Sequence, residues 1–422
     1  MARKDARNDR PVIPLPRREN QLDGRRLIRL IEDQLRLLHT LRTHGNRCFC
    51  YDPLGIALLL AFFNPARHSL RRIEDVFDLP AVRRFFDSGR APKSTVADAQ
   101  RLFDPELLRP IFEDLKQRTS LQPHDARLDE LTQPLTAVDG SFFTVAARIA
   151  WAIYNRKSDA GARGPRHQTG RRGLTTKGNV RAHVHFDIQR VVPEHFTLTG
   201  GQTSETSQLR RALPPEHCYI LDRGFQAYAL LGEIIQTHSD FVVRLRKSAR
   251  GTVLEARPLT AADLAAGVVS DTLVQVGWRE DQTADLPALR RVEVAVPDQD
   301  EPLVLLTSCL DLPAEMIALL YRHRWQIELF FRWLKCMAHL SHFYSESPQG
   351  MTLQLYVTLI ATLLIALETG ARPSVYDYSL MSLVMAGLAP LEQALAQAAK
   401  RRAERQRAAE RRRAKAAQKN QG

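Results

Sequence analysis

Residues 311–339, DLPAEMIALLYRHRWQIELFFRWLKCMAH, hold the pattern from which the rest of the chain is best interpreted. Asp311 and Pro313 are typical of a helix start. After Pro313, neither Pro nor Gly interrupts the stretch, and apolar residues recur at helical spacing. The sequence therefore predicts one long helix here.

One face of this predicted helix combines a carboxylate with cations and a phenol. Tyr321, Arg324, Glu328 and Lys335 fall within an arc of about 60° when each residue advances by ~100°, and Arg332 lies beside them. A lone Glu beside Arg and Lys is more often a plain ion-paired surface. Whether this face is a functional site or a plain surface depends on acidic residues elsewhere in the chain. The adjacent, apolar face would pack on a core and comprises Met316, Leu320, Ile327, Phe331 and Leu334.

Two aspartates earlier in the chain end predicted strands. Residues 136–143 are patterned as a strand that ends at Asp139, where Gly140 permits a tight exit. Residues 217–222 form an apolar strand that ends at Asp222. A parallel portion of a sheet would bring these ends together. The predicted order is strand, strand, strand, helix, strand, helix, strand, with the remaining strands at 180–188, 194–199 and 240–245 and the helices at 206–213 and 226–237.

Three carboxylates from three separate elements are a plausible set of metal ligands. Hard ions such as Mg²⁺ bind carboxylate oxygens, and two such ions serve both oxygens of an in-line displacement at phosphorus. Asp139, Asp222 and Glu328 would provide this set. Composition and pattern alone leave other acids open, and Glu205 follows a Gly-Gly turn that would place it near the site. The other acidic alternatives are Asp187, Glu194 and Asp240.

The N-terminal third is patterned as short helices with basic outer faces. We expect helices near 26–43, 53–63, 69–77, 79–86, 94–102 (capped by Ser94 or Thr95) and 105–118. Such a bundle suits a helix-turn-helix-like domain that binds DNA ends, and a structural bundle with a solvated face fits equally. The outward cations are Arg71, Arg72, Arg83, Arg84, Lys93 and Arg101.

Two further segments could contact DNA. Residues 156–181 are glycine-rich and basic, as in a phosphate-contacting loop or a plain surface loop. Residues 246–310 carry strand signals at 272–276, 291–296 and 302–307, and Trp278 is the only Trp among them. That side chain would either pack in the segment's own core or stack on a base turned out of a duplex.

Bulk properties limit the class of protein. The chain has 422 residues, enough for two or three domains. An odd number of cysteines fits a reducing cytoplasm, and His39, His44, Cys48 and Cys50 have poor spacing for zinc. We expect a cytoplasmic, nucleoid-associated protein without a membrane partner, in which 351–367 is a buried core helix. Walker-type loops, Gly-x-Ser-x-Gly and Cys-x-x-Cys motifs do not occur in the sequence.

The net charge of +13 is concentrated at the C-terminus. Residues 400–419 contain ten Lys or Arg and two Glu. This alanine-rich arm has a helical pattern and would be disordered when free. It would either hold nucleic acid by charge or remain solvated without a function.

The spacing Tyr-x2-Arg-x3-Glu-x6-Lys at Tyr321, Arg324, Glu328 and Lys335 resembles the Y-R-E-K signature of DDE-type bacterial insertion-sequence transposases. The resemblance extends over about residues 130–370. It includes AVDGSFF at 137–143, ILDRGF at 220–225 and HFYSES at 342–347.

This resemblance implies a specific site. Asp139 in AVDGS and Asp222 in LDRG match the first and second acidic motifs of these transposases. With Glu328 they would be the catalytic residues and the ligands of two Mg²⁺ or Mn²⁺ ions. By the same resemblance, Tyr321, Arg324 and Lys335 would hold phosphates of the DNA end. Arg332, beside them on the helix, and Trp278 are further candidates for DNA binding, and for Trp278 a packed aromatic is slightly favoured.

The resemblance also implies an α/β fold whose ribonuclease H-like catalytic core is interrupted by a β-rich insertion, with an α-helical N-terminal domain and a basic C-terminal tail. The core would occupy 130–245 and 311–370, and the insertion 246–310. The flanking parts would be a loose N-terminus at 1–20, a helical domain at 21–120, a helical segment at 371–399 and the tail at 400–422.

The implied function is a DNA transposase that binds its element's ends, cleaves strands with metal and transfers them to target DNA, as a homodimer on two ends. Two alternatives remain open. One is a non-catalytic DNA-binding protein derived from a transposase, and the other is a metal-dependent nuclease without strand transfer.

Overall fold

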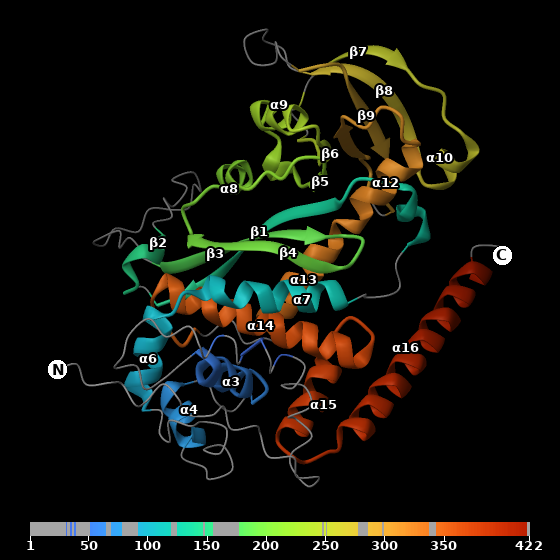
Figure 1. Ribbon diagram of the computed structural model, residues 1–422. Helices are drawn as coiled ribbons and strands as arrows, with labels where there is room; N and C mark the ends of the chain where they lie inside the picture. The colour runs from blue at the N-terminus through green and yellow to red at the C-terminus, as the bar shows by residue number, and fades with distance from the viewer. Residues whose placement is uncertain are drawn as a thin grey trace, which may run out of the picture. The chain divides into compact units, whose positions relative to one another are not determined.

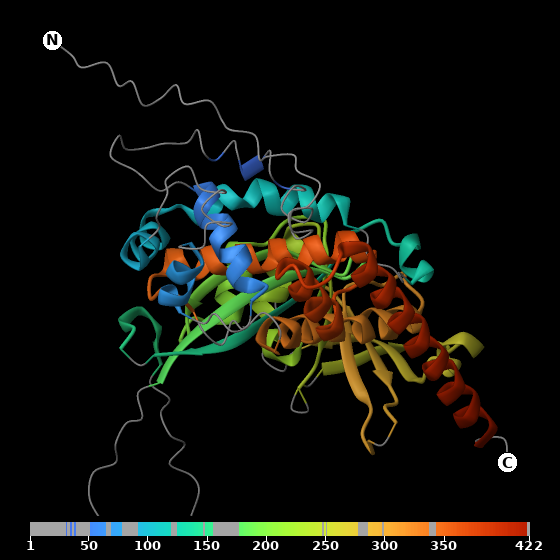
Figure 2. The ribbon, with the colours of Figure 1, turned by 90° about the horizontal axis from the view of Figure 1, so that it is seen from below.

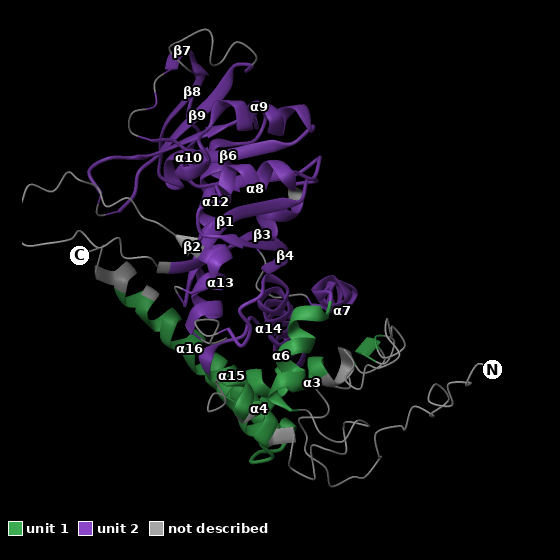
Figure 3. Cartoon of the chain, turned by 90° about the vertical axis from the view of Figure 1, so that its left-hand side faces the viewer, with its two compact units in different colours: residues 1–103, 376–422 green, residues 104–375 purple. Residues whose placement is uncertain are grey.

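The computed structural model describes residues 31, 34, 35, 38, 51–64, 69–77, 92–119, 125–146, 148–154, 177–246, 249, 251–276, 286–297, 299–336 and 343–419. These divide into two compact units (Figure 3). The larger unit comprises residues 104–375, and the smaller unit comprises 1–103 with 376–422.

The larger unit is built on a mixed sheet of ten strands. Along the sheet the order is β2-β3-β1-β5-β6-β10-β9-β8-β7, and β4 pairs with β3. The first strands are β1 (Leu135–Val145), β2 (Ile153–Tyr154), β3 (Lys177–Asp187), β4 (Val192–Gly200), β5 (Cys218–Leu221) and β6 (Asp240–Arg244). The remaining strands are β7 (Gly251–Ala256), β8 (Val268–Val276), β9 (Leu289–Val294) and β10 (Leu303–Thr307).

Parallel pairing is confined to the centre of the sheet, where β5 lies between β1 and β6. All four residues of β5 are buried, as expected for a parallel strand covered on both faces. Helices α8 (Glu205–Arg211) and α9 (Tyr228–Gln236) connect this region in sequence. Leu209, Leu230 and Ile234 from these helices join the strand residues in one core cluster. The architecture is mixed α/β, consistent with a ribonuclease H-like core.

The opposite face is covered by helices from before and after the sheet in sequence. Helix α13 (Trp325–Cys336) packs on β1, and α14 (Pro348–Thr369) packs on β4 with α7 (Arg109–Arg118) alongside (Figures 1 and 2). Helix α12 (Ala314–His323) packs on β6, β8 and β9. The predicted order of strands and helices from 136 to 245 is thus observed, with the short β2 added.

The strand at Asp139 differs from the prediction. Gly140 does not end the strand, because β1 continues to Val145 and pairs with β3 throughout. Gly140 lies opposite His183 in ordinary antiparallel pairing. A glycine in a strand marks either a bend or a close approach, and here it is the second.

The long helix predicted over 311–339 is also divided. Helix α12 ends at His323 and α13 begins at Trp325. Arg324 between them keeps helical dihedral angles (φ −52°, ψ −32°). Two backbone hydrogen bonds here span three residues instead of the usual four. The Arg324 N–H donates to the Tyr321 carbonyl and the Ile327 N–H donates to the Arg324 carbonyl, both at 3.1 Å. This tightening of the turn needs no Pro or Gly, so no sequence signal announces it.

Residues 246–310 contain strands, as predicted, but these strands do not form a separate sheet. Strand β10 pairs with β6, and β9, β8 and β7 follow in turn along the same sheet. Residues 277–285, with Trp278, lie outside the described residues.

Helix α14 is the one described helix that is long and apolar enough to cross a membrane, and 83% of its apolar window is buried inside the protein. It forms the predicted core helix of this unit, and its apolar character serves packing.

The smaller unit contains α3 (Tyr51–Phe62), α4 (Leu70–Phe77), α6 (Lys93–Leu102), α15 (Val375–Met385) and α16 (Leu391–Lys419). The Tyr378 hydroxyl donates a hydrogen bond to the Phe62 carbonyl, which ties α15 to α3. Helix α6 starts after Pro92 without a side-chain cap, so the prediction of Ser94 or Thr95 as the cap was wrong. Residues 1–30, 79–86 and most of 26–43, with His39, His44, Cys48 and Cys50, are outside the described part.

Candidate active site

The register of the central strands sets the positions of Asp139 and Asp222. The parallel pairing of β1 with β5 ends at Val138 opposite Leu221. Asp139 and Asp222 are the next residue on each strand, so their backbones leave the last paired positions side by side. Asp222 then leads into a short 3₁₀ turn, whereas Asp139 continues within β1. The predicted juxtaposition of these two aspartates is thus present, with only Asp222 at a strand end.

Asp139 is a half-buried carboxylate in acidic surroundings. Its pKa is raised from 3.8 to about 6, chiefly by burial and further by the charges of Glu205 and Asp222, against a hydrogen bond from Gly140 and the charge of Arg324. The Gly140 N–H donates to Asp139 Oδ1 at 2.8 Å. Like charges at short range disfavour ionisation. The charged form of the Asp139 carboxylate is therefore destabilised by its surroundings.

Glu205 is the acid that sequence reasoning left open. It is the first residue of α8, and a Cβ on residue 140 would overlap its Oε1 and lie 3.1 Å from its Cδ and Cγ. Burial raises the pKa of Glu205, and Asp222 adds to this, while Arg181 opposes it. Gly140 therefore serves the close approach of Glu205 to Asp139. The Gly-Gly turn before α8 was the signal for this position.

Arg181 holds Glu205 in place. Its guanidinium lies 3.7 Å from Glu205 Oε1 and 4.0 Å from the centre of the Phe142 ring. It also donates to the Thr203 carbonyl at 3.3 Å. The Nε of Arg181 is buried and has no hydrogen-bond partner among the described residues.

Glu328 lies on α13 and is linked to the two aspartates through a cation, Arg324. Arg324 donates a short hydrogen bond to Glu328 Oε1 across one turn. The Tyr321 hydroxyl lies 3.4 Å from Asp222 Oδ1. Burial lowers the pKa of Arg324, but Tyr321, Glu328 and Asp222 outweigh it and the net pKa is raised. Arg324 is thus close to Asp139, Asp222 and Glu328 together, although the helix is divided at its position.

The other cations of this helix lie farther along it. Lys335 is exposed and its Nζ is 5.6 Å from the centre of the Phe143 ring, beyond Asp139 on β1. Arg332 is exposed and lies 6.0 Å from the Trp325 ring. Both are available to a partner along α13. Trp278 and the basic loop at 156–176 lie outside the described residues.

The remaining acidic alternatives lie elsewhere. Asp187 is opposite Thr136, three residues before Asp139 on β1, and Glu194 is also near Thr136. Asp240 starts β6 and accepts a hydrogen bond from Ser308 at 2.7 Å. Of the four alternatives weighed, only Glu205 is beside Asp139.

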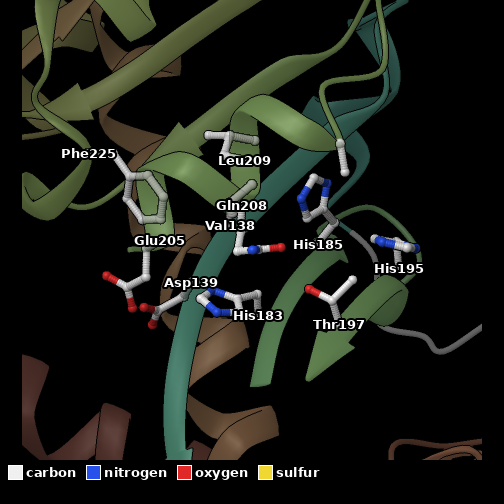
Figure 4. Close-up of a pocket in the computed structure, with 11 residues that line it drawn as sticks. Val138, Asp139, His183, His185, His195, Thr197, Glu205, Gln208, Leu209 and Phe225 are labelled. Atoms are coloured by element: carbon white, nitrogen blue, oxygen red, sulfur yellow. The ribbon is translucent and has the colours of Figure 1, made fainter. Parts of the chain in front are cut away.

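A small histidine-lined cavity borders the acidic residues. It has room for about one water molecule, about 10 Å³. Figure 4 shows the carboxylates of Asp139 and Glu205 directed to the same side, next to the His183 ring. Burial lowers the pKa of His183 to about 4 and that of His185 to about 3, so both rings are neutral at pH 7. Sequence reasoning missed these histidines, although their alternation on β3 placed them on one face.

The donor set has the chemistry of a divalent-cation site. Asp139, Glu205 and Asp222 are oxygen donors whose mutual repulsion a cation would relieve. Within the described residues, no three Asp, Glu, His or Cys side chains are arranged closely enough to form a metal site by themselves. Glu328 is meanwhile paired with Arg324. The chemical type of these side chains therefore fits a hard cation. Glu328 stays paired with Arg324, which lies one helical turn before it.

Comparisons with known proteins agree on one family. The model of the transposase DDE domain matches residues 130–364. The chain is 30% identical over 185 residues to "Putative transposase y4zB" of Sinorhizobium fredii, covering 43% of this chain and 51% of that protein. It is 21% identical over 235 residues to "Probable transposase for insertion sequence element IS5377" of Geobacillus stearothermophilus, covering 55% and 56%.

The chain thus spans about half the length of the curated relatives it matches. A cryo-EM structure of a piggyBac transposase synaptic complex with hairpin DNA aligns with 91% of this chain and 82% of that chain, at 12% identity and a TM-score of 0.36. A likeness at that level carries no argument about this protein. The family match covers more than half of the chain, and on that basis the protein belongs to the transposase DDE domain family.

Proposed function

We propose that this protein is an insertion-sequence transposase that binds the ends of its element, cleaves strands there and joins the freed 3′-OH to a target strand. The observation that carries the proposal is the crowding of Asp139, Asp222 and Glu205 at the centre of the sheet of a DDE-family protein. Crowded carboxylates repel one another when charged, and a bound cation relieves this repulsion at neutral pH.

In this proposal Asp139, Asp222 and Glu328 hold two Mg²⁺ or Mn²⁺ ions. Such ions, when bound, polarise the scissile phosphate and activate the attacking oxygen. The chain's own contributions are positional. Tyr321 orients Asp222 through its hydroxyl, and Arg324 orients Glu328 through its hydrogen bond.

The cations of the divided helix would hold DNA. The Y-R-E-K interpretation assigns Tyr321, Arg324 and Lys335 to phosphates of the element end, and Arg332 joins them as an exposed cation. Phosphate contacts fix the register of a duplex and carry no sequence information. Trp278 remains a candidate for stacking on a base turned out of the duplex during a hairpin step, against the simpler role of a packed aromatic.

Glu205 acts as a positioning residue in this proposal. Its carboxylate is fixed from one side by Arg181 and from the other by contact with Gly140. It therefore limits where the Asp139 carboxylate can turn. It also adds negative charge that strengthens cation binding at Asp139.

The larger organisation belongs to the same proposal. A ribonuclease H-like core at 130–245 and 311–370 carries the reaction, the β-rich insertion at 246–310 supports it, and the helical domain at 21–120 binds element ends. Two copies pair two ends on double-stranded DNA, in the bacterial cytoplasm near the nucleoid.

One experiment separates this proposal from its alternatives. The protein is incubated with Mg²⁺, a duplex made from the sequence flanking its own reading frame, and a supercoiled target plasmid. Joined products support transposition. Cut but unjoined ends indicate a metal-dependent nuclease, and retarded but uncut DNA indicates a non-catalytic binding protein.

A further inference from the structure

Helix α16 changes character along its length. It starts with a buried stripe at helical spacing, Leu391, Ala394 and Ala398, each at most 2% exposed. The next positions on that stripe are Arg402 and Arg405. The helix therefore continues past the core of its own unit with arginines where apolar residues had been.

The first two arginines anchor the helix. Arg402 Nη1 lies 3.2 Å from the Asp377 carboxylate, which is almost fully buried. Arg401 lies over the Tyr376 ring, 5.9 Å from its centre, and 3.3 Å from Glu404. These contacts fix the direction of the helix where it leaves the core. They also pair Glu404, one of the two acidic residues between 400 and 419, with Arg401.

Beyond Arg402 the helix is solvated. Every described side chain from 403 to 415 is exposed. At ~100° per residue, five of the six cations between 403 and 415 occupy an arc of about 160°. They are Arg405, Arg407, Arg411, Arg412 and Lys415. Arg413 and Glu410 lie outside the arc, whereas Glu404 lies within it and pairs with Arg401. The distribution of the cations is thus mainly one-sided.

Nothing in the described contacts offsets the repulsion within this face. Arg407, Arg411 and Lys415 follow one another at i,i+4 spacing, where like charges destabilise a helix. The alanines between them favour the helix. A polyanion bound to this face would neutralise several of its cations together.

The dimensions and chemistry favour duplex DNA among polyanions. Residues 403–419 extend about 25 Å along the helix axis, the length of roughly seven base pairs at 3.4 Å each. A helix of about 10–12 Å diameter fits a major groove about 12 Å wide. Past Leu395 the apolar side chains of this helix are alanines, which provide little area for insertion into a lipid surface.

We propose that the exposed basic face of α16 is a second DNA-binding surface, which contacts the phosphates of duplex DNA without reading its sequence. It is independent of the acidic residues of the other unit and needs no cleavage. Its role would be to hold flanking or target DNA by charge, so that its contribution falls steeply with salt.

The test compares two matched quadruple variants of the full chain. In one, Arg405, Arg407, Arg411 and Arg412 are changed to Gln, and in the other the same four are changed to Lys. Binding to a fluorescent 30-base-pair duplex of arbitrary sequence is measured by anisotropy over a KCl series. At about 0.9 per phosphate contact, the Gln variant should lose about 3–4 units of the log Kd–log salt slope, whereas the Lys variant should keep the wild-type slope.

Three controls make the result decisive. Circular dichroism and a thermal melt establish that both variants fold as the wild type does. Asp139→Asn should bind this duplex as the wild type does, so failure of cleavage and failure of the arm are distinguishable. An unchanged slope in the folded Gln variant overturns the proposal, as does wild-type protein that binds phosphatidylserine vesicles at the same ionic strength but not the duplex.

Discussion

The acidic site of the larger unit and the basic face of α16 hold charge in opposite ways. Asp139, Glu205 and Asp222 are crowded and half-buried, and the pKa of Asp139 is raised to about 6, chiefly by burial and further by the two neighbouring acids. The cations of α16 are spread along an exposed helix and interact through solvent. Buried like charges destabilise a fold unless a ligand compensates, so three residues suffice to infer a site. Exposed charges cost little, so inference there depends on their number and one-sided placement.

A second contrast, within the sheet, supports the same lesson. Asp187 is also half-buried and its pKa is also raised, chiefly by burial. Its carboxylate, however, accepts a hydrogen bond from the Arg190 N–H at 2.8 Å and has Arg190 beside it. Asp139 has acids as neighbours. Burial alone therefore does not mark a functional carboxylate, and the sign of the neighbouring charge does.

The largest expected effect is that of metal removal. If the acidic residues work through bound cations, chelation with EDTA should reduce cleavage of element-end DNA to the background rate, and Mg²⁺ or Mn²⁺ should restore it. Retardation of the same DNA should persist in EDTA, because the phosphate-contacting cations need no metal. Undiminished cleavage in EDTA would show that the acidic residues do not work through bound cations, and the contrast between the acidic and the basic region would then fail.

The next effect is on stability. Because the pKa of Asp139 rises from 3.8 to about 6 on folding, its protonated form favours folding at pH below about 4. That contribution is lost between pH 4 and 6, and above pH 6 the buried charge destabilises the metal-free fold by up to about 3 kcal/mol. Asp139→Asn should therefore increase the free energy of urea unfolding at pH 7.5 and have little effect near pH 4. A gain independent of pH would contradict this cause.

A smaller effect tests the contact between Gly140 and Glu205. Gly140→Ala places a methyl group against the Glu205 carboxylate, and we expect a loss of about 1 kcal/mol, because the end of a flexible side chain can move away. The double variant with Glu205→Ala should regain that loss, as a double-mutant cycle in urea would show. Additive losses would mean that Gly140 is required by something other than Glu205.

The smallest effect concerns a single cation on α13. Lys335→Ala should lower the salt slope of element-end binding by about one unit and weaken the cut complex. Arg118→Ala is a suitable control, since Arg118 is an exposed cation of the same unit that pairs with Asp114. A normal slope with normal cleavage would favour a plain ion-paired surface around Glu328.

Sequence reasoning predicted the sheet's central elements because alternation and apolar runs were strong there. It did not predict that β1 passes through Gly140, because a glycine after an aspartate indicates a turn more often than a close side-chain approach. The division at Arg324 was invisible, since its backbone remains helical. Glu205 stayed an open alternative, because no local pattern reveals which acid faces Asp139 across the β1–α8 contact.

The most direct measurement compares carboxylate substitutions that differ only in location. Asp139→Asn, Asp222→Asn and Glu328→Gln are tested beside Asp187→Asn, in cleavage and in retardation of the same element-end duplex with Mg²⁺. We predict that the first three lose at least about 10³-fold in cleavage rate, about 4 kcal/mol of barrier, and keep their DNA affinity, while Asp187→Asn cleaves as the wild type does. Wild-type cleavage by any of the three, or an equal loss in Asp187→Asn, would contradict the assignment of this site.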